Sequence, residues 1–101
     1  MAEPTFVYDV HDPTTRGLES TAAWRSFLAW MRGQRMNPNQ TRRIELYDLD
    51  GTWFARTVEY TQARQGGRLL DPATRDWVTH TSTYVIAGPP PSEIPVGGAR
   101  G

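Results

Sequence analysis

The chain of 101 residues contains no cysteine and no lysine. The lack of cysteine excludes disulfide bonds, a thiolate nucleophile and any zinc site built on thiolate ligands. No run of about 18 apolar residues is present, so we expect no membrane-spanning helix. The start of the chain, MAEPTFVYDVHD, lacks the basic and then apolar segments of a secretory signal, so we expect a cytoplasmic protein.

The charge of the chain is balanced, because 11 basic and 11 acidic residues give a net charge of zero. Such a chain has no strong field to attract nucleic acid or an anionic membrane. Every basic residue is arginine, which a GC-rich genome favours; the alternative is that guanidinium groups are selected to bind phosphate or carboxylate. That alternative rests on a cluster in a segment without acidic residues, made of Arg32, Arg35, Arg42 and Arg43.

Hydrophobic periodicity predicts one domain of the α+β class. Residues 5–10 alternate like a strand. Residues from about 18 to 35 place apolar side chains at helical spacing, with Ser20 or Thr21 able to cap the start, until Asn37-Pro38-Asn39 ends the helix. Residues 42–64 contain two strand-like runs, and residues 77–87 contain a third. We therefore predict a small two-layer domain of order β-α-β-β-β, in which an antiparallel meander packs on one helix.

Residues 44–53, IELYDLDGTW, resemble the segment with which haloacid-dehalogenase-like phosphatases present their nucleophile. The resemblance implies that Asp48 attacks phosphorus and that Asp50 handles the proton of the leaving group. That family also needs a downstream lysine, which this chain lacks. The residues that follow favour a strand, and too few remain for a parallel sheet with its helices. We therefore reject a phosphatase, and a metal site at the two aspartates is the remaining alternative.

A β-hairpin accounts for the same segment, because Asp50-Gly51 is a dipeptide that a two-residue type I′ turn prefers. A turn centred there aligns one aromatic pair and two pairs of opposite charge, each worth roughly 0.2–1 kcal/mol. A slip of one residue would remove all three matches. The predicted pairs are Leu49–Thr52, Tyr47–Phe54, Glu45–Arg56 and Arg42–Glu59.

The C-terminal segment differs in composition from the rest, so we predict a domain over residues 1–88 and a tail over residues 89–101. The tail is rich in proline and glycine, and its run of three prolines favours a polyproline II conformation. It is either an ordinary tail or a strip that docks on an aromatic groove of another protein. The candidate partner contacts are Trp77, Thr79, Thr81, Pro89, Pro90 and Pro91.

Two segments of the chain, FLAWMRGQRMNPNQTRRIELYD and LLDPATRDWVTHTSTYVIAGPPP, carry a loose family resemblance. The chain resembles small uncharacterised proteins of actinobacterial phages and prophages over residues 24–91. The shared features are a helix, an N-P-N break, a hairpin, a D-P-A-T loop and a final run of prolines. The resemblance implies an accessory protein that acts inside a GC-rich bacterial host, and it supplies no catalytic residues.

Catalysis is not expected from this composition. His11 and His80 are the only histidines, and no nucleophile elbow, phosphate-binding glycine loop or metal-ligand spacing accompanies them. We predict a non-enzymatic protein-interaction module that binds a host or virion protein or itself, without catalytic residues, cofactor or metal. Nucleic-acid binding through the arginine cluster is the alternative. Self-pairing into a homodimer would use an edge strand of the meander.

Overall fold

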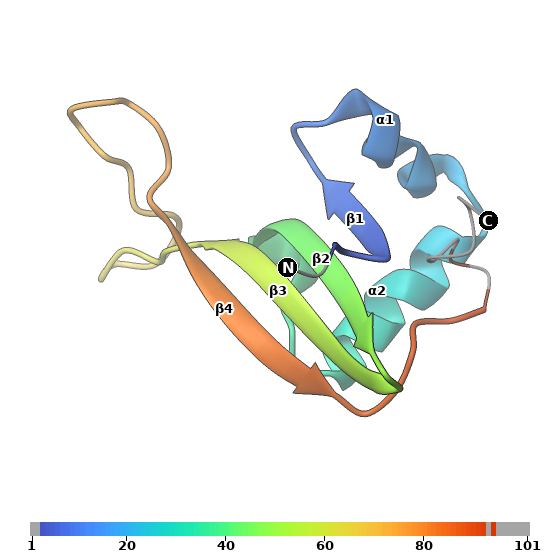
Figure 1. Cartoon of the computed structure of the whole chain (residues 1–101). Helices are drawn as coiled ribbons and strands as arrows, with labels where there is room; N and C mark the ends of the chain where they lie inside the picture. The colour runs from blue at the N-terminus through green and yellow to red at the C-terminus, as the bar shows by residue number, and fades with distance from the viewer. Residues whose placement is uncertain (1–2, 93, 95–101) are drawn as a thin grey trace.

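The computed structural model describes residues 3–92 and residue 94, and Figure 1 gives the arrangement of the elements. The elements follow in the order β1 (Phe6–Asp9), α1 (Pro13–Arg16), η1 (Gly17–Ser20), α2 (Ala23–Gly33), η2 (Pro38–Gln40), β2 (Thr41–Leu49), β3 (Thr52–Tyr60) and β4 (Thr79–Ile86). The strands form one antiparallel sheet of order β1-β2-β3-β4. The predicted α+β class is confirmed.

The helical part between β1 and β2 is more divided than the predicted single helix over residues 18–35. A four-residue helix, α1, comes first; Asp12 caps it by accepting a hydrogen bond from the Thr14 amide at 2.9 Å. The η1 turn ends at Ser20, and Thr21 is extended, so that α2 begins only at Ala23. The Thr21 hydroxyl donates to the Leu18 carbonyl at 2.8 Å, which satisfies the end of this turn locally.

The core lies between α2 and one face of the sheet, which we call the inner face. Cross-strand partners share a face, so the register places Tyr8, Ile44 and Thr57 together on this side. The α2 side chains Phe27 and Met31 pack against it and are buried. Figure 1 shows α2 lying across one side of the sheet, with no helix on the other side within the described residues.

The hairpin is confirmed in its turn and in most of its register. Asp50 and Gly51 have φ values of 55° and 89°, as a type I′ turn requires. The pairs Leu49–Thr52, Tyr47–Phe54 and Glu45–Arg56 are as predicted. The predicted pair Arg42–Glu59 is wrong, because an irregularity between Thr41 and Arg43 leaves Arg42 without a partner in β3 and brings Thr41 opposite Glu59.

An arm of residues 61–78 separates β3 from β4 and replaces the ends of both predicted strands. β3 ends at Tyr60 rather than near Arg64, and β4 begins at Thr79 rather than at Trp77. Isolated bridges pair Gln62 with Arg68 and Leu70 with Trp77, and the Leu69 amide donates to the Thr61 carbonyl at 2.8 Å. In Figure 1 the arm projects beyond the sheet on the side opposite to the helices.

The described part of the predicted tail contributes to the core. Pro90 is buried, and Ile94 is 3% exposed and belongs to the same apolar cluster as Phe27. The amide of Ile94 donates to the Pro91 carbonyl at 2.9 Å, which closes a turn after the prolines. The core therefore extends past residue 88, where the predicted domain ended; residues 93 and 95–101 lie outside the described part.

Candidate interaction surface

The two edges of the sheet differ in how they are protected. β1 has four residues, follows Pro4 and carries Asp9, all of which discourage pairing with another strand. β4 has eight residues, THTSTYVI, without proline, lysine or an acidic side chain. Its register with β3 runs without irregularity from Trp53–Ile86 to Tyr60–Thr79. The β4 edge is therefore the one suited to accept a further strand.

The register identifies which backbone groups of β4 face outward. The Thr61 amide donates to the Val78 carbonyl at 2.9 Å, and this pair continues the register of β3 with β4. Hydrogen-bonded and non-hydrogen-bonded pairs alternate along an antiparallel ladder. The even-numbered residues of β4 therefore bond to β3, and outward N–H and C=O groups belong to Thr79, Thr81, Thr83 and Val85, which we call the outward residues.

The outward residues also expose their side chains on the second face of the sheet, which we call the outer face. Val85 is 75% exposed and stands in a row with Phe54 and Tyr47, its neighbours across β3 and β2. Leu49, at the hairpin end of the same face, is 45% exposed. An apolar row thus borders the open edge of β4 at the hairpin end.

The centre of the outer face is charged but compensated. Arg43 forms ion pairs with Asp9 at 3.1 Å and with Glu45 at 2.8 Å. Burial alone would raise the pKa of Asp9, but hydrogen bonds from the His11 amide and the Arg43 guanidinium outweigh it and hold that pKa below its ordinary value. Arg43 therefore has little charge left for an external phosphate.

The four arginines of the predicted cluster do not form one surface. Arg43 lies on the outer face, whereas Arg32 and Arg35 belong to the end of α2 and the turn after it, which pack on the inner face. Arg42 sits at the irregularity of β2 and lines a small pocket with Tyr60 and other residues. Nucleic-acid binding through this cluster stays a prediction, and the division of the cluster between two faces weakens it.

The predicted partner contacts are partly available. Trp77 is 47% exposed at the base of the arm, and Thr79 and Thr81 are exposed on the open edge. Pro89 is exposed as well, but Pro90 is buried. The proline run is thus buried at its middle residue and half-buried at Pro91, so that Pro89 alone among the three prolines is exposed.

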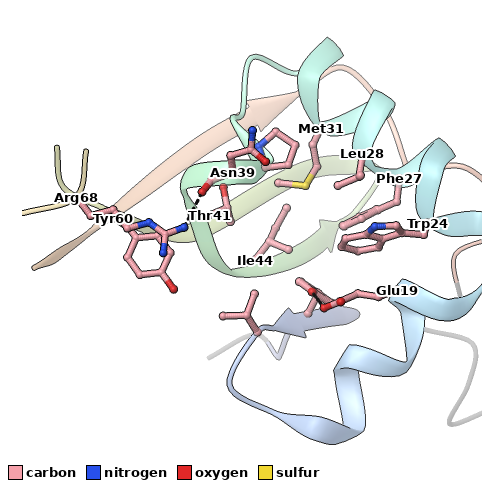
Figure 2. A pocket seen from close by; sticks show the side chains of 13 residues that line it. Glu19, Trp24, Phe27, Leu28, Met31, Asn39, Thr41, Ile44, Tyr60 and Arg68 are labelled. Atoms are coloured by element: carbon pink, nitrogen blue, oxygen red, sulfur yellow. Dashed lines mark hydrogen bonds between the residues drawn. The ribbon is translucent and has the colours of Figure 1, made fainter. Parts of the chain in front are cut away.

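A cleft of about 440 Å³ opens between α2 and the inner face, at the end of the sheet nearer the arm. Figure 2 shows Trp24, Phe27, Leu28 and Met31 lining it from α2, with Ile44 between them and the sheet. Arg68 and Tyr60 lie on the side opposite to Glu19. The volume and the lining of the cleft are typical of a small-molecule site. The periodicity of the sequence could not reveal this cleft, because one of its lining residues, Arg68, comes from the arm.

One polar group of this cleft is Glu19, which the Tyr8 hydroxyl and the Arg16 guanidinium both contact. The Tyr8 hydrogen bond is the main cause that lowers the pKa of Glu19. Burial first, and then the contact with Glu19, raise the pKa of the Tyr8 phenol. At neutral pH this pair is a compensated carboxylate next to a neutral phenol.

A second polar cluster occupies the inner face between β3 and β4. Glu59 accepts hydrogen bonds from the hydroxyls of Thr57 at 2.5 Å and Tyr84 at 2.6 Å. Its other oxygen lies 3.6 Å from His80 Nε2, while His80 Nδ1 lies 2.9 Å from the Thr61 hydroxyl. A hydroxyl, an imidazole and a carboxylate in this order can activate the hydroxyl as a nucleophile. Here, however, the 3.6 Å between His80 and Glu59 is too long for a hydrogen bond. The Thr61 hydroxyl also lines neither the cleft nor the pocket at Arg42.

Comparisons of the chain with protein-family models, with curated proteins and with solved structures find no match. Within residues 3–92 and 94, no three histidine, aspartate or glutamate side chains are gathered so as to hold a metal ion. None of the described helices is both long and apolar enough to cross a membrane.

Proposed function

We propose that this chain is a non-enzymatic protein-interaction module that accepts an extended strand of a partner protein along the open edge of β4. The context is a phage or prophage accessory protein in the cytoplasm of its host, with a host or virion protein as the partner. The carrying observation is the contrast between the two edges of the sheet, since only β4 is long, uncharged and regular.

The chemistry of the edge supports strand addition as the mode of binding. The outward residues offer four N–H and C=O pairs at alternate positions, which is the pattern that an added strand needs. Threonine and valine have high strand propensity and pack well against cross-strand neighbours. The edge has no fixed charge, so an uncharged strand fits it best, and the apolar row at Val85 gives such a strand a side-chain contact.

The decisive variant is Thr81→Pro. The Thr81 amide points away from β3, so proline removes an outward donor without removing a ladder hydrogen bond, a position that sheets tolerate. Thr81→Ala is the matched control, because it removes the side chain and keeps the amide. Each tagged form is used to capture proteins from an actinobacterial lysate with and without nuclease, and the captured amounts are compared by mass spectrometry.

Strand addition predicts one protein that wild type and Thr81→Ala capture equally and that Thr81→Pro loses. Equal capture by all three forms would refute the β4 edge as the binding site. Capture that occurs only without nuclease would favour the arginine cluster instead. Sedimentation of the purified forms addresses self-pairing: a wild-type dimer that Thr81→Pro reduces to a monomer identifies the partner as a second copy.

A further inference from the structure

The cleft between α2 and the inner face has an apolar body that the fold already holds in place. Phe27 and Ile44 form its floor and are fully buried, while Trp24 and Leu28 are half-buried along its side. Met31, also on α2, completes the apolar lining of the cleft. Because Phe27, Met31 and Ile44 also belong to the core and Trp24 packs against it, the fold holds most of the cleft wall in place and binding needs little further ordering.

The cation of the cleft is Arg68, and two contacts fix its position. Its guanidinium carbon lies 3.8 Å from the centre of the Tyr60 ring, and Nη2 donates to the Asn39 carbonyl at 3.0 Å. None of the described acidic side chains lies within ion-pair distance of it. A guanidinium carries five N–H donors in a planar fork, so most of them are open to an anion.

The opposite side of the cleft does not compete for that anion. Glu19 is negative there, and its charge is already met by Arg16 at 3.3 Å and by the Tyr8 hydroxyl. The Glu19 side therefore offers no unpaired cation to an anionic head group, whereas the Arg68 side does. In Figure 2 Thr41 and Ile44 lie between these two groups, and the apolar side chains of α2 line the cleft on the Glu19 side.

We propose that this cleft binds an amphipathic monocarboxylate, with the carboxylate on the free N–H groups of Arg68 and the apolar chain against Trp24 and Leu28. The arginine fork matches a carboxylate in two parallel hydrogen bonds. The site is separate from the β4 edge, and the inference does not depend on strand addition. The proposed class of ligand follows from the position of Arg68, a cation without an acidic partner, beside an apolar cleft.

The probe is decanoate, and its binding to the full chain is measured by isothermal titration calorimetry. Shortening the chain to octanoate is expected to weaken binding by about fourfold for each methylene that the cleft buries. Decanol, which has the same chain without the charge, is expected to bind at least about tenfold more weakly. Decanol binding as tightly as decanoate, or no decanoate binding at millimolar concentration, would overturn the proposal.

Two pairs of variants locate the ligand. Arg68→Gln is expected to weaken decanoate binding by at least about tenfold, whereas Arg64→Gln, an exposed arginine of the same arm outside the cleft, leaves it unchanged. Leu28→Trp fills the cleft and removes binding, whereas Ala29→Trp adds the same ring on the exposed side of α2 and does not. Equal decanoate affinities for the two variants of either pair would show that the ligand binds outside this cleft. Where a variant fails to fold, the comparison of decanoate with decanol on the wild type still tests whether the carboxylate is recognised.

Discussion

Replacement of Phe27 by alanine is the perturbation that most directly tests the account of the core. The Phe27 side chain is 0% exposed and lies at the centre of the contact between α2 and the sheet. Four other rings have their centroids 5.5–6.5 Å from its own. Those rings belong to Phe6, Tyr8, Trp24 and Trp30.

The expected cost follows from the burial of this ring. Truncating a fully buried phenylalanine to alanine destabilises a core by about 3–5 kcal/mol, and the aromatic pairs place Phe27 at the upper part of that range. A domain of this length has a free energy of unfolding of roughly 5–15 kcal/mol. A loss of about 4 kcal/mol is therefore roughly a quarter or more of the stability, and a marginal protein would unfold.

Urea denaturation followed by tryptophan fluorescence measures the effect. With an m-value near 1.5 kcal/mol/M, a loss of about 4 kcal/mol lowers the midpoint by nearly 3 M. Val85→Ala is the control, because that side chain is 75% exposed and its loss is expected to change stability by no more than about 0.5 kcal/mol. A loss below 1 kcal/mol for Phe27→Ala, at an unchanged m-value, would show that this ring is not at the centre of the core.

Three further outcomes follow from single contacts. Gly51 has a φ of 89°, so Gly51→Ala is expected to lose about 1–2 kcal/mol in urea denaturation, and an unchanged midpoint would contradict the type I′ turn. The pKa of Asp9 lies below its ordinary 3.8, so its pairing with Arg43 stabilises the fold above that pH and is lost as the pH falls through the lower folded value. In the Asp9→Asn variant the free energy of unfolding should therefore fall less steeply with decreasing pH than in the wild type. Equal slopes for the two proteins would show that the Asp9–Arg43 pair does not contribute to stability. Burial and the hydrogen bond to Glu59 raise the pKa of Tyr84 from its ordinary 10.0 to about 12. The stabilisation from this contact is therefore complete below pH 10.0 and is lost as the pH rises through about 12. Glu59→Gln should lower that pKa in an NMR titration of the tyrosine ring, and an unchanged value would contradict the contact.

Local sequence decided the features whose partners are close along the chain. The Asp50-Gly51 turn formed as predicted, because glycine and aspartate accept positive φ and the paired side chains on either side agree with one register. The apolar spacing over α2 likewise identified its buried face, including Phe27 and Met31. These signals depend on nearest neighbours and helical period, which a sequence displays directly.

The boundaries and the candidate sites escaped prediction where a distant contact competes with local preference. One boundary was missed for a local reason: the apolar spacing begins near residue 18, yet Thr21 is extended and its hydroxyl donates to the Leu18 carbonyl three residues earlier. The sequence around Arg42 gives no sign that the ladder skips this residue. Strand propensity at Trp77 could not show that it would pair with Leu70 across the arm instead of continuing β4.

The sequence by itself determined the class of the domain, the α2 face that is buried and the turn that joins β2 to β3. Only the tertiary structure decided which edge of the sheet stays open and that Arg68, 29 residues from Asn39, completes the cleft. It also decided that Ile94 joins the core. The physical reason is that periodicity and turn chemistry act over a few residues, whereas an edge, a cleft and a closed core exist only once distant segments have packed together.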